Sequence, residues 1–511
     1  MKDPKQLLLK NVLSNWVSFA IGIIITFFLS PFLVHTLGKE NYGIWALVIS
    51  IINYTNLLDA GMKQSLARYI PKFYANRDYP KINEVINSSN LIYSLTGSLV
   101  IVVTILIALF FVGVFKVSPE SISMMRTTLI IIGVDQAIMF YFMAGTAIGP
   151  FHRYDVSNVI GILASIVQAL VIFAFLSFGY GIVTLALVTL VSNFLRNIVR
   201  RWYQQHLVPE IEFKLKHINK GIIRELMTYG FISFFIVAGW MVVFHTDNVV
   251  VGLFISATAV AYYNIAGTLI NYLRLLVMAI GVPLVPAISH IDALGNMKEI
   301  AGLYARLTRY LYYFSGAICA ITFLFGAKFI YAWMGPEFSD TVRILYILIL
   351  PVCIYLPQIT ANSILLGIGK HKPLFYILAV ESIANLGLSL ALVKPLGVYG
   401  VALGTAVVQV LIYTYVFPYI FHRLIGGDLK LFYVSSLKMI VASVVFTVPA
   451  GLLMRLVNPL PGWTGLILDG IVVGSSVTAG FWLTALNSQD RARILNRYLK
   501  KKLSSDVTPT A

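Results

Sequence analysis

The chain has 511 residues, of which 59% are hydrophobic and 12% are charged, and its formal net charge is +17 at pH 7. Soluble domains carry about 25% charged residues, so the composition excludes a soluble globular protein and predicts an all-α, polytopic membrane protein. The two cysteines, Cys319 and Cys353, lie inside apolar segments, which excludes a disulfide framework and a cysteine-rich metal site. The basic residues gather in alternate loops, as expected for membrane insertion and not for nucleic-acid binding.

Apolar runs of about 20 residues predict about fourteen transmembrane helices. We expect them at 12–35, 42–64, 88–115, 123–148, 157–178, 182–203, 226–254, 259–282, 306–333, 341–367, 373–393, 398–421, 432–456 and 464–486. The basic loops then place both termini in the cytoplasm. The loops are too short to fold as a separate catalytic domain.

The two halves of the chain share a weak internal repeat. Ile52, Asn53, Tyr54, Leu57 and Leu58 recur as Ile270, Asn271, Tyr272, Leu275 and Leu276, and Pro119, Glu120 and Arg126 recur as Pro336, Glu337 and Arg343. Tyr93 and Gly97 recur as Tyr312 and Gly316, and the shift stays between 217 and 219 residues. Because the repeat unit holds an even number of helices, six, both copies keep the same orientation, and a pseudo-twofold axis along the membrane normal should relate them.

The repeat predicts the domain organisation. We expect an N-terminal lobe at 1–205, a cytoplasmic linker at 206–225, a C-terminal lobe at 226–425, two appended helices at 430–488 and a basic cytoplasmic tail at 489–511. Transporters built from such repeats bind the substrate between the lobes and rock one lobe against the other.

Arg274 lies far from either end of the apolar stretch 261–283. A guanidinium keeps its charge, and at the bilayer centre it costs roughly 2.5 to 3.5 kcal/mol on insertion scales. Two interpretations are open. Arg274 lines a path for an anionic substrate, with the repeated pair Asn53 and Asn271 as further candidate substrate-binding residues, or it forms an internal salt bridge that holds helices together.

Four other residues in the apolar segments are candidates for ion coupling. Asp135 lies about 16 Å into its helix at 1.5 Å per residue, where it can carry a proton, bind a cation or pair with Arg274. Glu381 has Asn385 one turn later on the same face. His245 and Asp247 lie near the outer end of their helix, where snorkelling to the interface favours a structural role.

Near the cytoplasmic end of the second expected helix, Asp59 and Lys63 are spaced i, i+4, which predicts a local ion pair or a charged mouth to a cavity. Gly400-x-x-x-Gly404 predicts close helix packing within the chain. The sequence contains no phosphate-binding loop and no zinc-protease motif, so we expect no enzyme and no bound cofactor.

Four segments carry a family resemblance. Tyr42 to Asp78 (YGIWALVISIINYTNLLDAGMKQSLARYIPKFYANRD), Thr246 to Leu269 (TDNVVVGLFISATAVAYYNIAGTL), Leu365 to Pro373 (LLGIGKHKP) and Pro395 to Ala406 (PLGVYGVALGTA) stand at or beside expected helix ends. With them the chain resembles the polysaccharide and O-antigen flippases of the multidrug/oligosaccharidyl-lipid/polysaccharide exporter superfamily. Fourteen helices agree best with its exporter and lipid II flippase branches, and in the latter the two appended helices form a groove for the polyprenyl tail.

The resemblance implies a bacterial inner-membrane protein that translocates an undecaprenyl-diphosphate-linked oligosaccharide by alternating access, for O-antigen, capsule or another surface glycan. Arg274 would meet the diphosphate, and Lys63 and Arg68 would draw the headgroup in from the cytoplasm. Asp135 and Glu381 would couple transport to a Na⁺ or H⁺ gradient or to the membrane potential. The partners would be the lipid-linked glycan, the bilayer and glycan-assembly proteins such as a polysaccharide polymerase, with no nucleic acid. The alternative is an ion-coupled exporter of cationic drugs with the same fold, whereas a glycan ligase would need a catalytic cluster in the outer loops.

Overall fold

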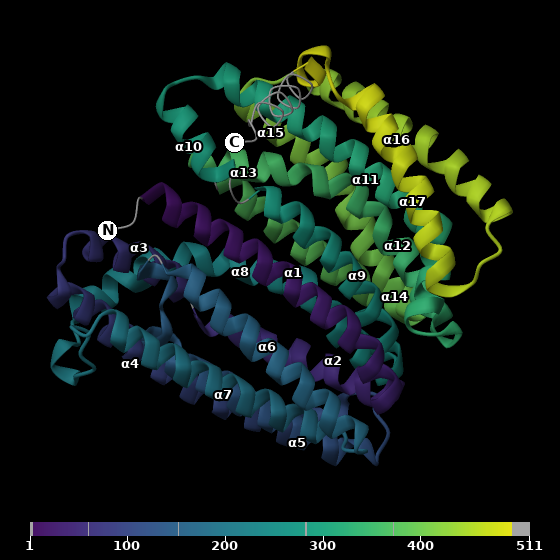
Figure 1. The fold of residues 1–511 in the computed structure, drawn as a ribbon. Coiled ribbons are helices and arrows are strands. Elements are labelled where there is room, and N and C mark those ends of the chain that lie inside the picture. The colour runs from purple at the N-terminus through teal and green to yellow at the C-terminus, as the bar shows by residue number, and fades with distance from the viewer. Residues whose placement is uncertain (1–3, 60, 152, 282–283, 371, 493–511) are drawn as a thin grey trace, which may run out of the picture. The chain divides into compact units, whose positions relative to one another are not determined.

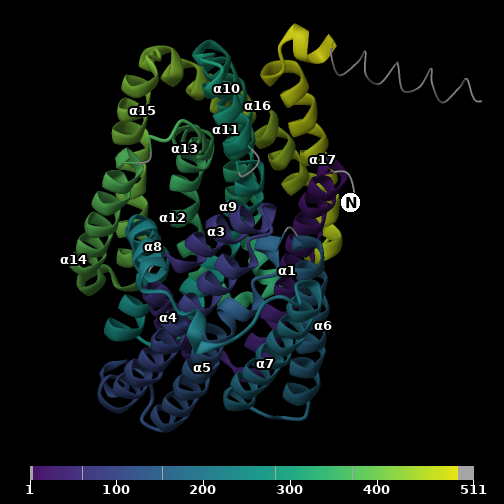
Figure 2. The ribbon, with the colours of Figure 1, turned by 90° about the vertical axis from the view of Figure 1, so that its left-hand side faces the viewer.

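The computed structural model describes residues 4–59, 61–151, 153–281, 284–370 and 372–492. The regular elements within these ranges are all helices (Figures 1 and 2). They are α1 Pro4–Leu37, α2 Lys39–Asn53, α3 Met62–Ala75, α4 Tyr79–Leu106, α5 Ser121–Met143, α6 Tyr154–Ser177, α7 Ile182–Leu207, α8 Lys220–Phe254, α9 Ala257–Gly281, α10 Leu284–Ala293, α11 Met297–Trp333, α12 Ser339–Tyr355, α13 Ile359–Gly367, α14 Lys372–Leu411, α15 Phe417–Ile425, α16 Leu429–Val457 and α17 Gly462–Gly480, with single 3₁₀ or π turns between some of them.

The helices have the length and composition of membrane-spanning segments. Ten stretches in the described ranges are long and apolar enough to cross a membrane, and an eleventh joins them if α2 and α3 form one broken span. This confirms the predicted all-helical, multi-pass class. The count of fourteen spans, the pseudo-twofold axis and the division into lobes stay predictions.

The prediction of one continuous helix at 42–64 is wrong. α2 ends at Asn53, a 3₁₀ segment follows at Tyr54–Asp59, and α3 leaves at a bend of 47°. Gly61 stands at the start of α3 with φ 76°, a conformation that glycine adopts without strain. A Cβ at Gly61 would lie 2.2 Å from the main-chain oxygen of Gly230, so the close approach to α8 also requires glycine. The break is also a change of character, because α2 is apolar whereas α3 is amphipathic, with Lys63, Arg68 and Lys72 on its exposed face.

α14 is a helical hairpin. Gly397, with φ 58° and ψ −140°, interrupts it. The side-chain amide of Asn385 donates to the hydroxyl of Thr405 at 3.0 Å, although residues 20 apart in a straight helix would be about 30 Å apart. The second arm packs closely on the first, since a Cβ at Gly400 would lie 2.1 Å from the main-chain oxygen of Leu392. The predicted close packing at Gly400 and Gly404 is confirmed within the chain, and the reversal brings polar residues of both arms together.

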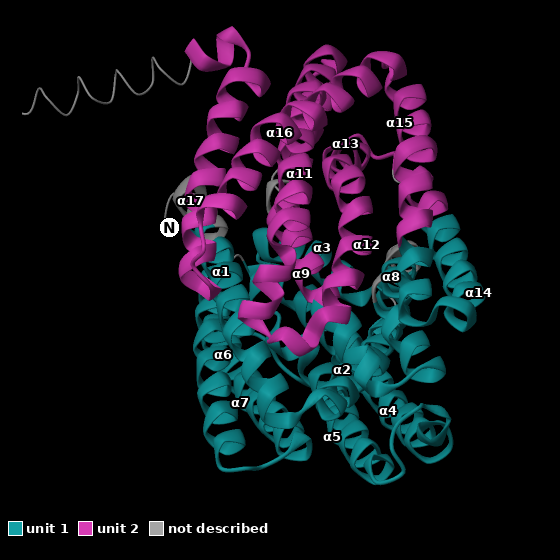
Figure 3. Cartoon of the chain, turned by 90° about the vertical axis from the view of Figure 1, so that its right-hand side faces the viewer, with its two compact units in different colours: residues 1–265, 378–405 teal, residues 266–377, 406–511 magenta. Residues whose placement is uncertain are grey.

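The chain forms two compact units (Figure 3). Unit 1 contains residues 1–265 and 378–405, and unit 2 contains residues 266–377 and 406–511. In unit 1, α5 packs between α4 and α7, and α6 packs against α1 and α7. In unit 2, α11 is central and packs against α12, α16 and α17, while α10 packs against α13.

Candidate functional site

A polar layer crosses α8 within unit 1. Thr246, Asp247 and Asn248 are consecutive and all buried. Successive helical residues project about 100° apart, so the three side chains reach different neighbours. Thr246 shares a hydrogen bond with the hydroxyl of Tyr54, and the Asn248 amide donates to the Ser50 hydroxyl at 3.0 Å.

Asp247 is the centre of this layer. Its Oδ2 accepts hydrogen bonds from the Tyr263 hydroxyl at 2.6 Å and from the Thr405 hydroxyl at 2.8 Å. Thr405, on the second arm of α14, accepts in turn from Asn385 on the first arm. Within the described ranges the carboxylate makes no ion pair, and three buried oxygens of the layer, Asp247 Oδ1, Asn248 Oδ1 and Asn385 Oδ1, have no hydrogen-bond partner. The layer therefore holds a buried anionic group and unsatisfied oxygen acceptors.

The expected snorkelling of Asp247 to the interface is wrong, because its side chain is buried among α8, α9 and α14 and is 5% exposed. His245, two residues earlier on α8, is half-buried. Glu381 lies one turn before Asn385 on α14 and is 2% exposed. Asn385 and Glu381 thus lie on the first arm of α14. This arm reaches the Asp247 layer through the hydrogen bond from Asn385 to Thr405.

Asp135 belongs to a different place in unit 1. Its Oδ2 accepts from the Asn193 amide at 2.7 Å, and the Arg196 guanidinium, almost one turn further along α7, attracts it electrostatically. Asp135 is 5% exposed. Its hydrogen bond and its nearby cation both come from α7, so within unit 1 Asp135 joins α5 to α7. A pair with Arg274 was one of three alternatives for Asp135, beside carrying a proton and binding a cation, and this choice stays open.

Asp59 ends the 3₁₀ segment before α3. Its Oδ1 accepts from the Tyr93 hydroxyl at 2.9 Å and its Oδ2 from the main-chain N–H of Lys63 at 3.3 Å. Asp59 thus bonds to the main chain in the first turn of α3, where a carboxylate is favoured by the exposed N–H groups. The predicted side-chain ion pair with Lys63 is not formed within 4 Å, although the charge of Lys63 still attracts the carboxylate. The Lys63 and Arg68 side chains are exposed, while Met62, Leu66, Tyr69, Ile70 and Phe73 form the buried face of α3.

Arg274 is half-buried on α9 in unit 2. Its Nη2 donates to the Asn271 side-chain oxygen at 2.6 Å, about one turn earlier, and Tyr355 of α12 lies close enough to interact with it electrostatically. Asn53 stands at the end of α2, half-buried, and its main-chain oxygen accepts from the Asn56 amide at 3.1 Å. The candidate pair Asn271 and Arg274 is thus one local hydrogen-bonded group.

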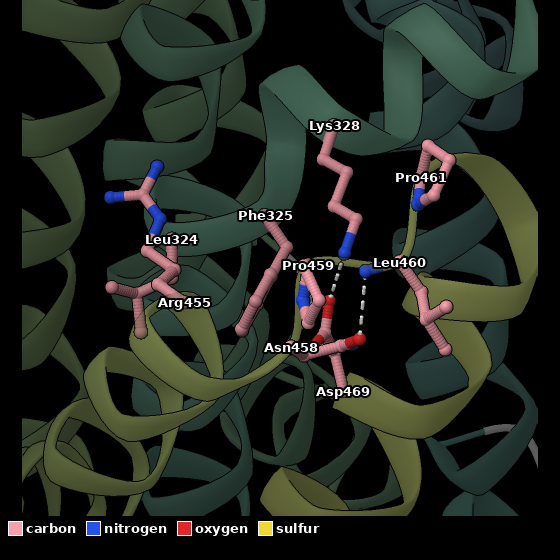
Figure 4. Close-up of a pocket in the computed structure, with 9 residues that line it drawn as sticks. All are labelled: Leu324, Phe325, Lys328, Arg455, Asn458, Pro459, Leu460, Pro461 and Asp469. Carbon is pink, nitrogen blue, oxygen red and sulfur yellow. Dashed lines mark hydrogen bonds and ion pairs between the residues drawn. The ribbon is translucent and has the colours of Figure 1, made fainter.

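One pocket of unit 2, of about 360 Å³, lies at the connection between α16 and α17 (Figure 4). The Lys328 ammonium lies 2.7 Å from Asp469 Oδ2, and the Asn458 amide donates to Asp469 Oδ1 at 2.8 Å. Figure 4 shows Arg455 apart from this group. Both carboxylate oxygens are satisfied, so Lys328 and Asp469 form a structural ion pair beside this pocket, and sequence reasoning missed it. Lys328 and Asp469 are 141 residues apart, and no local signal links them.

Thr405, Tyr263 and Asn193 were also missed as site residues. The run Thr246 to Asn248 inside an apolar helix was the signal that could have drawn attention to the layer. The expected separate helices at 373–393 and 398–421 already implied the reversal at Gly397. Thr405 itself had no signal, because the sequence does not show that its hydroxyl faces Asp247.

Two solved structures share the fold. The inward closed conformation of the lipid II flippase MurJ matches with a TM-score of 0.70 at 15% identity, covering 92% of this chain and 98% of that one. The inward-facing conformation of a multidrug resistance MATE family transporter of the MOP superfamily matches with a TM-score of 0.68 at 15% identity, covering 80% of this chain and 95% of that one. The fold is therefore that of the helical, multi-pass transporters and flippases of this superfamily.

The family follows from sequence comparison. The profile of the polysaccharide biosynthesis protein family matches residues 8–292, more than half of the chain, and a MatE profile matches residues 233–391. The chain belongs to the polysaccharide biosynthesis protein family. It is 21% identical over 497 residues to the membrane protein EpsK of Bacillus subtilis (strain 168), covering 96% of this chain and 98% of EpsK. It is 20% identical over 414 residues to a protein of Shigella flexneri provisionally named an O-antigen transporter, covering 78% of this chain and 94% of that protein. The predicted superfamily membership is confirmed.

Proposed function

We propose that the protein is a flippase that translocates an undecaprenyl-diphosphate-linked oligosaccharide across the bacterial inner membrane by alternating access, for surface polysaccharide biosynthesis. The single observation that carries the proposal is the polysaccharide biosynthesis family match over residues 8–292. The names of the Shigella flexneri relative and of the flippase MurJ support the same substrate class, a glycan attached to a lipid carrier.

The physical requirement for this substrate is a polar, positively biased path. Two phosphates cannot enter hydrocarbon without compensation, whereas the lipid tail can stay in the bilayer. A guanidinium presents five N–H donors in a fixed fork that matches phosphate oxygens. The bond from Arg274 Nη2 to Asn271 orients the fork. Arg274 is therefore the residue that we assign to the diphosphate.

The exposed face of α3 supplies the entry. Lys63, Arg68 and Lys72 are exposed on it, and the positive-inside rule assigns this helix to the cytoplasmic side, with both termini of the chain on that side. Clustered basic side chains raise the local concentration of anionic headgroups near a membrane surface. In this proposal α3 collects the diphosphate headgroup before it reaches Arg274.

The Asp247 layer supports coupling to a cation gradient. Asp247 Oδ1, Asn385 Oδ1 and the Thr405 hydroxyl are oxygen ligands of the type that hard cations such as Na⁺ prefer, and a carboxylate can equally take up a proton. Glu381 adds a second buried carboxyl group on the same helix as Asn385. We assign this layer to Na⁺ or H⁺ coupling, with Asp135 bound to α7 as a second candidate, and the membrane potential adds to the driving force on any moved charge.

Complementation of glycan export tests the substrate assignment. In a bacterial strain lacking the native protein, Arg274→Ala should reduce surface glycan by at least about tenfold, because charge-assisted hydrogen bonds to phosphate are lost. Arg274→Lys should retain part of the activity, since it keeps the charge but not the fork. Arg423→Ala, at an exposed arginine at the end of α15, is the matched control and should export normally. Wild-type glycan levels with Arg274→Ala would refute the assignment.

The second candidate function is cation-coupled export of cationic drugs. The MatE match at residues 233–391 favours it, as does the matching multidrug transporter structure. A drug exporter would confer resistance that depends on Asp247 and would leave surface glycan unchanged when Arg274 is replaced. Resistance assays with dye and antibiotic substrates in the same strain separate the two functions.

A further inference from the structure

A second cavity of unit 2, of about 430 Å³, differs from the pocket at Lys328. It lies beside the first turns of α11 and α16 and the end of α15. The positive-inside rule predicts that this end of α11 faces the cytoplasm. The cavity plays no part in the proposed path through Arg274 or in the Asp247 layer.

One edge of the cavity is built to hold an anion. Arg306 Nε and Arg309 Nη2 lie 3.9 Å and 3.6 Å from the carboxylate of Asp490, which also accepts from the Tyr310 hydroxyl at 2.7 Å. Arg309 Nη1 donates to the Asn487 side-chain oxygen at 2.5 Å. Within the described ranges, Arg309 Nε and Nη2 are buried and make no hydrogen bond. The carboxylate of Asp490 thus lies beside two guanidinium groups, and two buried donors of Arg309 have no hydrogen-bond partner in the described ranges.

The inner wall of the cavity is polar and aromatic. Tyr304 and Thr308 are 5% and 4% exposed, and in the described part of the chain neither hydroxyl makes a hydrogen bond of normal geometry. The rings of Tyr304 and Phe432 stack with centroids 6.4 Å apart, and the His422 ring lies 4.8 Å from that of Phe432. The two hydroxyls interact at most weakly with each other, and buried hydroxyls without a well-formed hydrogen bond are costly. Aromatic faces cover apolar C–H surface. This wall suits a small group that carries both hydroxyls and C–H bonds.

The wall formed by α11 leaves room for such a group. Ala301, Gly302 and Ala305 line it, and a Cβ added at Gly302 would meet no atom within 4 Å. Asp428 also lines the cavity. Its carboxylate accepts hydrogen bonds from the main-chain N–H groups of Lys430 and Leu431, at 2.8 and 3.1 Å, and so caps the first turn of α16. At the Lys328 pocket, in contrast, the lysine is already paired with Asp469.

We propose that this cavity binds a phosphate ester of a small hydroxylated group, with the phosphate at Arg306 and Arg309 in place of Asp490, and the hydroxylated group against Tyr304, Thr308 and Phe432. A lipid headgroup from the cytoplasmic leaflet and a soluble sugar or polyol phosphate share this chemistry. A phosphate monoester offers the arginines more charge and more acceptor oxygens than the carboxylate of Asp490 does. A phosphodiester headgroup carries a single charge, like the carboxylate, and gains over Asp490 by the contacts of its hydroxylated group with Tyr304 and Thr308.

Binding to the purified full-length protein in neutral detergent tests the proposal without reference to transport. Native mass spectrometry would follow phosphatidylglycerol, with phosphatidylcholine as the zwitterionic control, and a thermal-shift titration would follow glycerol 3-phosphate. We expect phosphatidylglycerol or glycerol 3-phosphate to bind, and Arg309→Gln and Gly302→Leu each to weaken that binding by about tenfold or more. Phosphatidylglycerol binding that glycerol 3-phosphate does not displace identifies a lipid headgroup site, and displacement identifies a soluble phosphate ester.

Two further variants distinguish a loss of the binding site from a loss of the fold. Gly470→Leu, at another helical glycine with open space around its Cβ position, is the matched control and should bind as the wild type. Asp490→Asn removes the competing charge and should tighten binding several-fold, whereas a merely structural role of Asp490 would lower the melting temperature and leave affinity unchanged. Unchanged affinity in Arg309→Gln, Gly302→Leu and Asp490→Asn, or no binding of either probe by the wild type, would overturn the proposal.

Discussion

Asp247 in unit 1 and Asp469 in unit 2 are both almost fully buried, yet their surroundings differ. Asp469 has a lysine at 2.7 Å and an amide on its other oxygen, so its charge and both its oxygens are compensated. Asp247 has two hydroxyl donors on one oxygen, while its other oxygen has no hydrogen-bond partner in the described ranges. Burying an uncompensated carboxylate costs several kcal/mol. The difference separates a carboxylate that holds helices together from one that is available to a cation.

The largest effect should follow from Asp247→Asn. If the carboxylate takes up the coupling cation, its loss should abolish glycan export in the complementation assay, a decrease of about a hundredfold or more, since an amide neither carries the charge nor takes up the proton. The protein should remain folded, because an amide can still accept from Tyr263 and Thr405. Export at the wild-type level would show that Asp247 has no role in coupling and is, like Asp469, a structural carboxylate.

Breaking the ion pair should have the next largest effect, on stability. Lys328→Met leaves Asp469 buried without its cation, and removal of one partner of a buried pair costs about 3 to 5 kcal/mol. Thermal unfolding in detergent would measure this loss. The double variant Lys328→Met with Asp469→Asn should recover part of it. Export by the folded fraction should stay close to wild type, and a specific loss of export in the stable double variant would show that this pair is functional too.

Thr405→Val should have a smaller effect that refines the role of the Asp247 layer. It keeps the shape of the side chain but removes one donor to Asp247 and the acceptor of Asn385. The free energy of unfolding should fall by about 1 to 3 kcal/mol, because buried polar groups lose a partner. Export measured against cation concentration should require several-fold more cation. A change in stability with no change in cation dependence would assign Thr405 a structural role only.

The smallest effect concerns Asp490, a carboxylate outside the membrane-spanning helices. The hydrogen bond from Tyr310, with the nearby charges of Arg306 and Arg309, lowers the pKa of Asp490 below its usual value near 3.8. A folded-state pKa below the unfolded value stabilises the fold above about pH 4, and this contribution is lost as the pH falls through the folded-state pKa. Because surface pairs are screened by solvent, we expect only a few tenths of a kcal/mol. Melting curves from pH 6 down to pH 3 for wild type and Asp490→Asn should converge at the acid end.

Sequence alone predicted the parts of the site that depend on composition along one helix. Glu381, Asp247 and Asp135 were found because a carboxylate inside an apolar run stands out, whatever surrounds it. Arg274 and Asn271 are about one turn apart on the same helix, so helical periodicity alone can predict that their side chains are neighbours. The role of each residue was left open, because a single helix does not show which groups face it.

The partners of these residues came from contacts between distant segments. Asp135 bonds to Asn193, 58 residues away, and Lys328 pairs with Asp469, 141 residues away. The break after Asn53 also escaped prediction, because it depends on the close approach of Gly61 to Gly230 on α8.

The apolar runs and the charge of the loops by themselves determined that this chain is a helical, multi-pass membrane protein, since a segment in lipid must satisfy its own main-chain hydrogen bonds. The family-specific segments determined its relatives. Only the tertiary structure decided which buried carboxylate is compensated and which is not. The sequence shows which side chains are charged. The groups that compensate each charge come from other segments, which helix packing and the reversal of α14 at Gly397 place beside it.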